Sequence, residues 1–322
     1  MHPNKPNDFL PCVPPECLRL RADLLDQLRL FFKRRRFLEV ETPLLSVDTV
    51  VDRHIEPIFG VTVGRQMWLQ TSPEFCMKRL LAAGEEAIFQ VAKAFRAGEQ
   101  GALHNFEFTM AEWYRVGDSM RDGMRLLDEL SCELIGRGSA ELVSYLEAFQ
   151  QHVGIDPHSI ETEELKDHAQ RVLGESVQSV TSFDRDGVLN LLLAELVEPR
   201  LGCQRPVILY DYPASQSALA IVRDGKPPVA ERFELYVDGI ELANGYHELL
   251  DADVLRERNS AVNRQRVDDG KRPLPEQSRL LDAMEHGLPA CTGVALGFDR
   301  LVMIAAGAKS ISEVMAFPFD RA

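Results

Sequence analysis

Two extended segments around a loop, from residue 95 to residue 115, constrain this chain most strongly. Aromatic and apolar residues alternate along the second segment and lead into acidic and phenolic residues on the same side. That side carries Phe106, Phe108, Met110, Glu112 and Tyr114. A solvated strand face has no need of phenylalanine and methionine, and a plain core face would not carry a glutamate. With Arg96 at the turn, the pattern predicts a pocket on a sheet that holds an anion at one end and a cation at the other.

Length and composition indicate an ordinary globular enzyme. The chain has 322 residues, 45% of them hydrophobic, which allows a sizeable core in one large or two ordinary domains. No apolar run is long enough to cross a bilayer, and residues 1–15 are polar and proline-rich, unlike a signal peptide. The six cysteines lack zinc-ligand or Cys-x-x-Cys spacing, which favours free thiols in a reducing compartment. We therefore expect a cytoplasmic protein with no membrane partner.

The charge balance bears on the kind of partner. There are 50 acidic and 36 basic residues, and the formal net charge is −14. Proteins that wrap tRNA present a broad basic face, because phosphate neutralisation supplies much of their affinity. The one compact basic cluster, at residues 33–36, ends an expected helix, where it complements the helix dipole. The composition therefore argues against tRNA as a partner.

The order of elements predicts the fold class. Helical patterns fall at residues 16–36, 75–83, 119–135 and 251–269. Extended patterns fall at residues 37–45, 68–74, 88–92, 206–213, 233–237 and 240–250. Residues 136–206 are mixed in character, and we interpret them as an insertion with helices near 161–173 and 186–197. Since runs of strands outweigh a strand-helix alternation, we expect an α+β fold: a mostly antiparallel β-sheet flanked by helices.

Two further patterns carry chemistry, each with a simpler alternative. Gly293 and Gly297 precede Arg300 and an apolar helix pattern, as in a strand-to-helix turn, although a packing pair of glycines would look the same. Glu241 and Glu248 are seven residues apart and would face opposite ways on a flat strand. A turn or bulge at Asn244-Gly245 could bring them together as Mg²⁺ ligands, whereas a hairpin with solvated acids is the alternative.

The segment from His104 to Arg115 resembles motif 2 of the class II aminoacyl-tRNA synthetases in its lysine-specific form. Residues 17–45 resemble motif 1, which forms the dimer interface in that family, and residues 291–315 resemble motif 3. Motif 2 then spans about 88–115, and the class II catalytic fold spans 16–322 behind a polar extension over 1–15. Two departures stand out: Phe106 replaces a proline, and Arg96-Ala97-Gly98-Glu99 replaces Arg-Asn-Glu, which leaves the contact of the loop acid open.

The resemblance implies roles for individual residues. The catalytic residues it implies are Arg96 and Arg300. The amino-acid substrate would be bound by Ser72, Pro73, Glu74, Glu112, Tyr114, Glu248 and Ala295. ATP would be bound by Arg96, Ala97, Gly98, Asn105, Phe108, Glu241, Leu242, Gly297 and Arg300. Mg²⁺ would be held by Glu241 and Glu248. Apart from the resemblance, we expect His104 to be a structural hydrogen-bonding group rather than a base.

Ala295 stands where motif 3 has its middle glycine, and its added methyl group would narrow the amino-acid pocket. Only about fifteen residues precede the motif 1 match, too few for the anticodon-reading barrel of lysyl-tRNA synthetases. That layout, with matches at 212–220, 230–234, 293–297 and 320–322, resembles the elongation factor P–(R)-β-lysine ligases. The resemblance implies that ATP activates (R)-β-lysine, or lysine less well, as an adenylate. A homodimer would then transfer the β-lysyl group to a lysine of elongation factor P.

Two alternatives remain open at this point. One is a stand-alone lysyl-tRNA synthetase-like enzyme that charges tRNA, which Ala295 and the missing barrel oppose. The other is an inactive synthetase-like regulator. The intact residues that oppose it are Arg96, Glu241, Glu248 and Arg300, and the altered loop acid favours it. The sequence indicates neither the acceptor-docking surface nor the role of residues 136–206.

Overall fold

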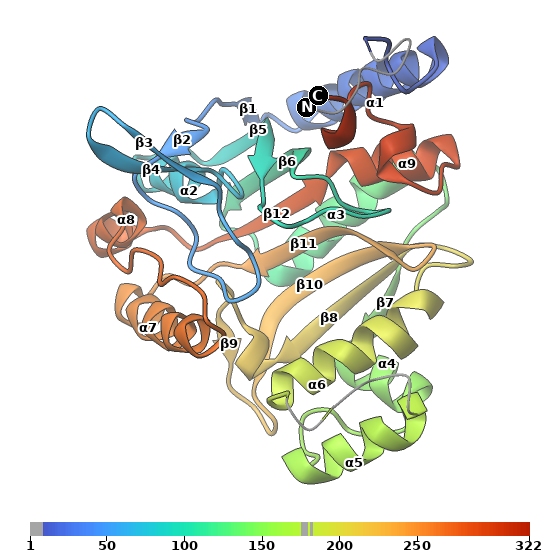
Figure 1. The fold of residues 1–322 in the computed structure, drawn as a ribbon, viewed down its shortest axis with the longest axis vertical. Coiled ribbons are helices and arrows are strands. Elements are labelled where there is room, and N and C mark those ends of the chain that lie inside the picture. The colour runs from blue at the N-terminus through green and yellow to red at the C-terminus, as the bar shows by residue number, and fades with distance from the viewer. Residues whose placement is uncertain (1–8, 175–179, 181–182) are drawn as a thin grey trace. The chain divides into compact units, whose positions relative to one another are not determined.

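The computed structural model describes residues 9–174, 180 and 183–322 (Figure 1). The chain divides into two compact units, Met1–Gly117 with Leu250–Ala322, and Asp118–Leu249. Residues 1–8 of the expected N-terminal extension lie outside the described residues, and the first helix begins at Pro15. Within the described part of the chain, no helix has the length and apolarity that a membrane span requires.

The first unit is built on a sheet whose strands follow the order β1-β5-β6-β12. These strands are β1 (Leu38–Glu39), β5 (Ala87–Phe95), β6 (Glu107–Val116) and β12 (Cys291–Gly297). β1 pairs with β5 in parallel, and the other two pairings are antiparallel. A small antiparallel sheet adds β2 (Leu45–Ser46), β4 (Arg65–Leu69) and β3 (Phe59–Thr62). β6, an inner strand of the larger sheet, is the strand that the sequence predicted from its alternating side.

Helices of the first unit include one near each end of the chain. They are α1 (Pro15–Arg34), α2 (Glu74–Ala82), α7 (Ala252–Asp268), α8 (Arg279–Gly287) and α9 (Phe298–Ala306). Short 3₁₀ turns follow at η6 (Ile311–Glu313) and η7 (Phe319–Arg321). α1 buries Leu24, Leu28 and Phe31 at helical spacing and lies beside α9 (Figure 1). Its last turn carries Lys33 and Arg34, so part of the basic cluster lies where it complements the helix dipole.

The second unit has a sheet in the order β11-β10-β8-β7, with β9 paired to β10. Its strands are β7 (Glu141–Ser144), β8 (Val207–Pro213), β9 (Val222–Arg223), β10 (Val229–Val237) and β11 (Ile240–His247). All pairings are antiparallel except that of β7 with β8. α3 (Met120–Ile135) begins at a reciprocal cap between Ser119 and Asp122 and ends at Gly136, whose φ is 70°.

The expected insertion contains the other helices of the second unit. They are α4 (Tyr145–His152), α5 (Thr162–Leu173) and α6 (Arg185–Leu192), followed by η3 (Leu193–Val197) and η4 (Glu198–Arg200), whereas the 3₁₀ turn η5 (Ala214–Gln216) comes after β8, outside the insertion. α5 and the α6-η3 stretch correspond to the two helical patterns in the sequence, while β7 and α4 were not expected. One apolar cluster joins these helices to the sheet, including Tyr145, Phe149, Leu165, Leu189 and Tyr212. Residues 175–179 and 181–182 lie outside the described residues.

One local prediction was wrong. Asn244 and Gly245 form no turn; they pair with Glu234 and Phe233 in the middle of β11. The register between β10 and β11 shifts elsewhere. Leu235 faces Ala243, but Tyr236 faces Glu241, so Leu242 has no partner residue and forms a bulge. The turn lies between the strands, at Asp238 and Gly239, where φ is positive.

Candidate active site

The register of β6 explains how the site is assembled in the first unit. Glu112 pairs with Gln90 on β5 and with Ala295 on β12, and Met110 pairs with Gly297. Cross-strand partners project from the same side of a sheet, so the methyl group of Ala295 lies next to the Glu112 side chain. Since Gly297 has no side chain, it leaves the sheet open beside Met110. The structure therefore brings together the residues that the sequence assigned to the amino-acid pocket from two different motifs.

The cation end is organised around Glu112, which is 1% exposed. Ser72 donates to Oε2 and the Tyr114 hydroxyl donates to Oε1, both at 2.6 Å. Burial, and then the charge of Glu74, raises the pKa of the Glu112 carboxyl to about 7, while the two hydroxyl donors and Lys78 oppose the rise. A buried carboxyl with this pKa can change its charge near neutral pH, which suits it to receive an ammonium group.

α2 supplies the rest of the cation end. Pro73 is its N-cap residue and Glu74 its first, and the Glu74 amide donates to the Ser72 hydroxyl at 3.1 Å. The Lys78 ammonium lies 2.5 Å from Glu74 Oε1. Sequence reasoning missed Lys78, although its spacing of four residues from Glu74 on a helix was a usable signal.

The anion end lies near the start of β6. The Arg96 guanidinium lies 5.1 Å from the centre of the Phe108 ring, and its Nε donates to the Thr71 carbonyl at 3.4 Å. Gly98 has a φ of 80°, and a Cβ placed there would meet nothing within 4 Å, so the loop requires glycine for its backbone conformation. Glu99 then approaches Arg96 at 3.7 Å, and Ala97 is tied to Glu56 through a backbone hydrogen bond.

Arg300 is held in the first turn of α9, three residues after the open backbone at Gly297. Its Nη2 lies 2.8 Å from His104 Nε2, and its Nε donates to the Leu103 carbonyl at 3.3 Å. Burial, and then the charge of Arg300, lowers the pKa of the His104 imidazole, so the neutral ring accepts this hydrogen bond. His104 is therefore engaged as a hydrogen-bonding group, as the sequence predicted.

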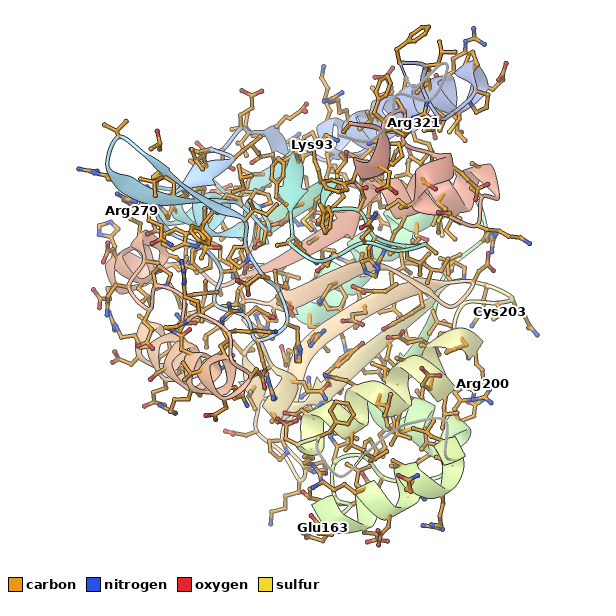
Figure 2. The ribbon with its side chains drawn as sticks, viewed as in Figure 1. Lys93, Glu163, Arg200, Cys203, Arg279 and Arg321 are labelled. Carbon is orange, nitrogen blue, oxygen red and sulfur yellow. The ribbon has the colours of Figure 1, made fainter. Side chains whose placement is uncertain are left out.

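The C-terminal segment packs on the motif 2 loop. Asn105 donates to the Glu107 carbonyl at 2.6 Å and accepts from the Phe319 amide at 3.0 Å, and the Phe319 ring meets Phe106 edge-on. Arg321, labelled in Figure 2, donates to the Leu10 carbonyl near the other end of the chain. The amide of Asn105 is thus engaged with backbone groups, and its contact with adenine stays a prediction.

A buried ion pair connects the strand and helix that carry the anion-binding residues. Asp299 is 1% exposed; its Oδ1 accepts from Arg21 of α1 at 2.5 Å, and its Oδ2 accepts from the Thr109 amide at 2.6 Å. Arg21 also donates to the Thr109 hydroxyl at 2.7 Å. Both oxygens of Asp299 are therefore needed to hold α9 against β6 and α1.

We expect Asp299→Asn to destabilise the protein by about 3 kcal/mol, because the new amide cannot accept both hydrogen bonds and leaves the Arg21 charge without its carboxylate. Urea unfolding measures the loss. Glu39→Gln is the matched control, since Glu39 pairs with Arg29 at a site where its side chain is 42% exposed, and we expect a change below about 0.5 kcal/mol. Equal losses in the two variants would contradict this account.

In the second unit, the bulge at Leu242 reverses the alternation of β11. Glu241, Asn244 and Glu248 consequently share one side of the strand, with Glu248 lying just beyond its end. Glu241 and Glu248 thus share one face, as predicted, but the cause is the bulge at Leu242 and not a turn or bulge at Asn244-Gly245. Carboxylate oxygens suit Mg²⁺, although the described residues contain no group of three or more His, Cys, Asp or Glu that could hold a metal.

A buried carboxylate on the same sheet face was missed from the sequence. Glu234 is 4% exposed; its Oε2 accepts from the hydroxyl groups of Tyr212 and Tyr236, and its Oε1 accepts from Arg232. Asn244, its cross-strand partner, has a buried amide oxygen without a hydrogen-bond partner. The alternation of Arg232, Glu234 and Tyr236 along β10 was a signal for such a polar face.

Residues 14–321 match the family model described as tRNA synthetases class II (D, K and N). The chain belongs to this family. The class II synthetase fold predicted from the sequence is confirmed, together with its α+β, mostly antiparallel character. Family membership also implies the use of ATP.

Several relatives are similar to the chain over nearly all of its length. The elongation factor P–(R)-β-lysine ligase of Edwardsiella ictaluri is 45% identical over 97% of this chain and 98% of its own. The ligase of the same name from Vibrio cholerae is 46% identical over 98% and 99%, and that from Yersinia enterocolitica is 44% identical over 97% and 98%. These similarities confirm the predicted relationship and the prediction of a ligase.

Proposed function

We propose that this protein activates (R)-β-lysine with ATP and transfers the β-lysyl group to a lysine side chain of elongation factor P. The observation that carries the proposal is the buried Glu112 carboxylate beside Ala295, held by the hydroxyl groups of Ser72 and Tyr114. A desolvated ammonium requires a charge partner and hydrogen-bond acceptors, and this arrangement offers both. Relatives that bear the corresponding name are 44–46% identical to the chain.

In this proposal, the distal ammonium of the substrate binds Glu112 and Tyr114, and the amino group nearer its carboxylate binds Glu74. Arg96 binds the substrate carboxylate and the α-phosphate of ATP, while Phe108 stacks on the adenine. These positions follow the direction of β6, along which Phe108 and Glu112 are separated by about 13 Å, a span suited to a nucleotide and an amino acid end to end.

Two group transfers follow. A carboxylate oxygen of the amino acid attacks the α-phosphorus, and pyrophosphate leaves with its charge stabilised by Arg300. The ε-amino group of the acceptor lysine then attacks the carbonyl carbon and loses a proton, while AMP leaves. Glu241 and Glu248 would hold Mg²⁺, which supplies charge stabilisation at the phosphates when bound.

The homodimer and the cytoplasmic location also belong to this proposal. α1, within the segment that resembles motif 1, leaves Leu18 and Leu30 exposed, and exposed leucines on a helix are suited to a subunit interface. Sedimentation velocity of the protein tests the dimer directly, and a monomer at micromolar concentration would contradict it.

Pyrophosphate exchange with each lysine isomer tests the activation step. We expect exchange with (R)-β-lysine and weaker exchange with α-lysine. Labelled (R)-β-lysine offered with elongation factor P and, separately, with tRNA then identifies the acceptor. Label on tRNA alone would overturn the proposed acceptor, and the absence of exchange with every isomer would leave the inactive regulator as the explanation.

Ala295→Gly tests the shape of the pocket. Removing the methyl group beside Glu112 opens space, so we expect the preference for (R)-β-lysine over α-lysine, as the ratio of kcat/KM values, to fall by about 10-fold. Ala94→Gly, a small-residue change at another buried position of the same sheet, is the matched control and should leave the ratio unchanged. An unaltered ratio in Ala295→Gly would refute the steric argument.

A further inference from the structure

A buried ammonium group, that of Lys78, lies at the cation end of the pocket beside two carboxylates. The Lys78 side chain is 2% exposed, and its ammonium lies 2.5 Å from Glu74 Oε1 and 6.0 Å from the centre of the Tyr114 ring. Glu74 and Lys78 are one turn apart on α2, so the helix holds the pair in register. The proposed reaction assigns no step to this ammonium.

The two carboxyl groups and one ammonium group at this end of the pocket do not have balanced charges. If Glu74, Glu112 and Lys78 were all ionised, the pocket would carry one net negative charge in a buried place, where an uncompensated charge is costly. Lys78 pairs directly with Glu74. Glu112 is held by hydroxyl groups, which donate hydrogen bonds but bring no charge. The excess negative charge therefore falls on Glu112.

The groups that face Glu112 come from three sources in the first unit. α2 and the residues just before it contribute Ser72, Glu74 and Lys78, and β6 itself contributes Tyr114. The cross-strand partners Gln90 and Ala295 are uncharged. Among these groups, Glu74 favours the protonated form of Glu112, and Lys78 favours the ionised form.

We propose that Lys78 sets the charge of this pocket, so that the distal ammonium of the substrate enters in exchange for one proton held by Glu112. The inference rests on the proposed function. In the exchange, a neutral carboxyl group and an ammonium become a carboxylate-ammonium pair, and the proton passes to solvent. A neutral chain of the same length brings no charge to replace that proton, so the pocket selects a diamine.

Isothermal titration of (R)-β-lysine into the full-length protein, in phosphate and in imidazole buffer, counts the protons released, because the two buffers differ in their heats of ionisation. With a Glu112 pKa of about 7, we expect release of about 0.9 proton at pH 6, about 0.5 at pH 7 and about 0.1 at pH 8. 3-Aminoheptanoate, which has a methyl group in place of the distal ammonium, is the matched ligand and should release no proton at pH 6.

Variants of Lys78 separate its charge from its packing. Lys78→Met removes the charge that lowers the pKa of Glu112, so release at pH 8 should rise several-fold above wild type. Lys78→Arg keeps the charge and should restore the wild-type count. Lys93→Met, at a surface position labelled in Figure 2, should change nothing. If Lys78→Met does not fold, Tyr114→Phe removes a hydrogen bond that also lowers the pKa of Glu112 and should raise release at pH 8.

The outcomes are distinguishable. Equal proton counts at pH 6 and pH 8 in the wild type would overturn the exchange. A wild-type count in a folded Lys78→Met variant would overturn the role of Lys78, and a wild-type count in Tyr114→Phe would overturn the assignment of the released proton to Glu112. If no lysine isomer binds, both the proposed function and this inference are wrong. If (R)-β-lysine binds without releasing a proton, only this inference is wrong.

Discussion

Arg300→Ala should lower ATP–pyrophosphate exchange by about 10³-fold while leaving the fold intact. A guanidinium that meets phosphate in a water-poor site stabilises charge that develops as pyrophosphate leaves, and the loss of such a group typically costs this much. Arg300 is not one of the buried residues of α9, and its side chain reaches the Leu103 carbonyl and His104 in a surface loop, so its removal leaves the buried face of α9 unchanged.

Two further variants are needed to interpret the result for Arg300→Ala. Arg300→Lys keeps the charge but loses the paired donors, so exchange should be intermediate. Arg125→Ala, which removes a surface arginine with a 65% exposed side chain, should leave exchange unchanged. An exchange rate within tenfold of wild type in Arg300→Ala would refute its assigned role.

Glu112→Gln should weaken the binding of (R)-β-lysine by about 100-fold or more and leave the binding of ATP unchanged. The amide is neutral and similar in shape, but it leaves the distal ammonium buried without its charge partner, which typically costs 2–5 kcal/mol. Calorimetric titration with each ligand measures the two affinities. Glu107→Gln, at an exposed position on the same strand, is the control and should bind both ligands normally.

Glu112 also predicts how stability depends on pH. In the unfolded chain its proton leaves near the ordinary pKa of 4.5, and in the folded chain the pKa is about 7. The folded state therefore holds more protons between these values, so the free energy of unfolding of the ligand-free protein should fall by up to about 3 kcal/mol as pH rises through this range. Glu112→Gln should remove this decline, and an equal decline in both proteins would show that other groups cause it.

Local patterns predicted much of the fold. The spacing of apolar residues in α1 and in β6 can be read from residues close together in the sequence. Each element buries one side, and its geometry sets how often a side chain returns to that side. Predictions that depended on geometry between elements fared less well. A bulge at Leu242 replaced the turn or bulge expected at Asn244-Gly245, because backbone pairing with Glu234 and Phe233 kept both residues in the strand.

Contacts between distant segments could not be predicted in the same way. Phe319 anchors Asn105 across 214 positions, and Arg21 meets Asp299 across 278. Neither pair has a local signature, since each depends on how the chain returns to the sheet at β12 and α9. These contacts hold the loop and helix that carry the predicted nucleotide-binding residues.

The sequence by itself determined the chemical groups of the pocket: an arginine at one end of β6, and a carboxylate with a phenol at the other. Only the tertiary structure decided the charge of that carboxylate. Burial and the approach of Glu74 raise the pKa of Glu112 to about 7, while Lys78 opposes them. A pKa depends on exposure to solvent and on neighbouring groups in space, so it could not be predicted from the order of residues alone.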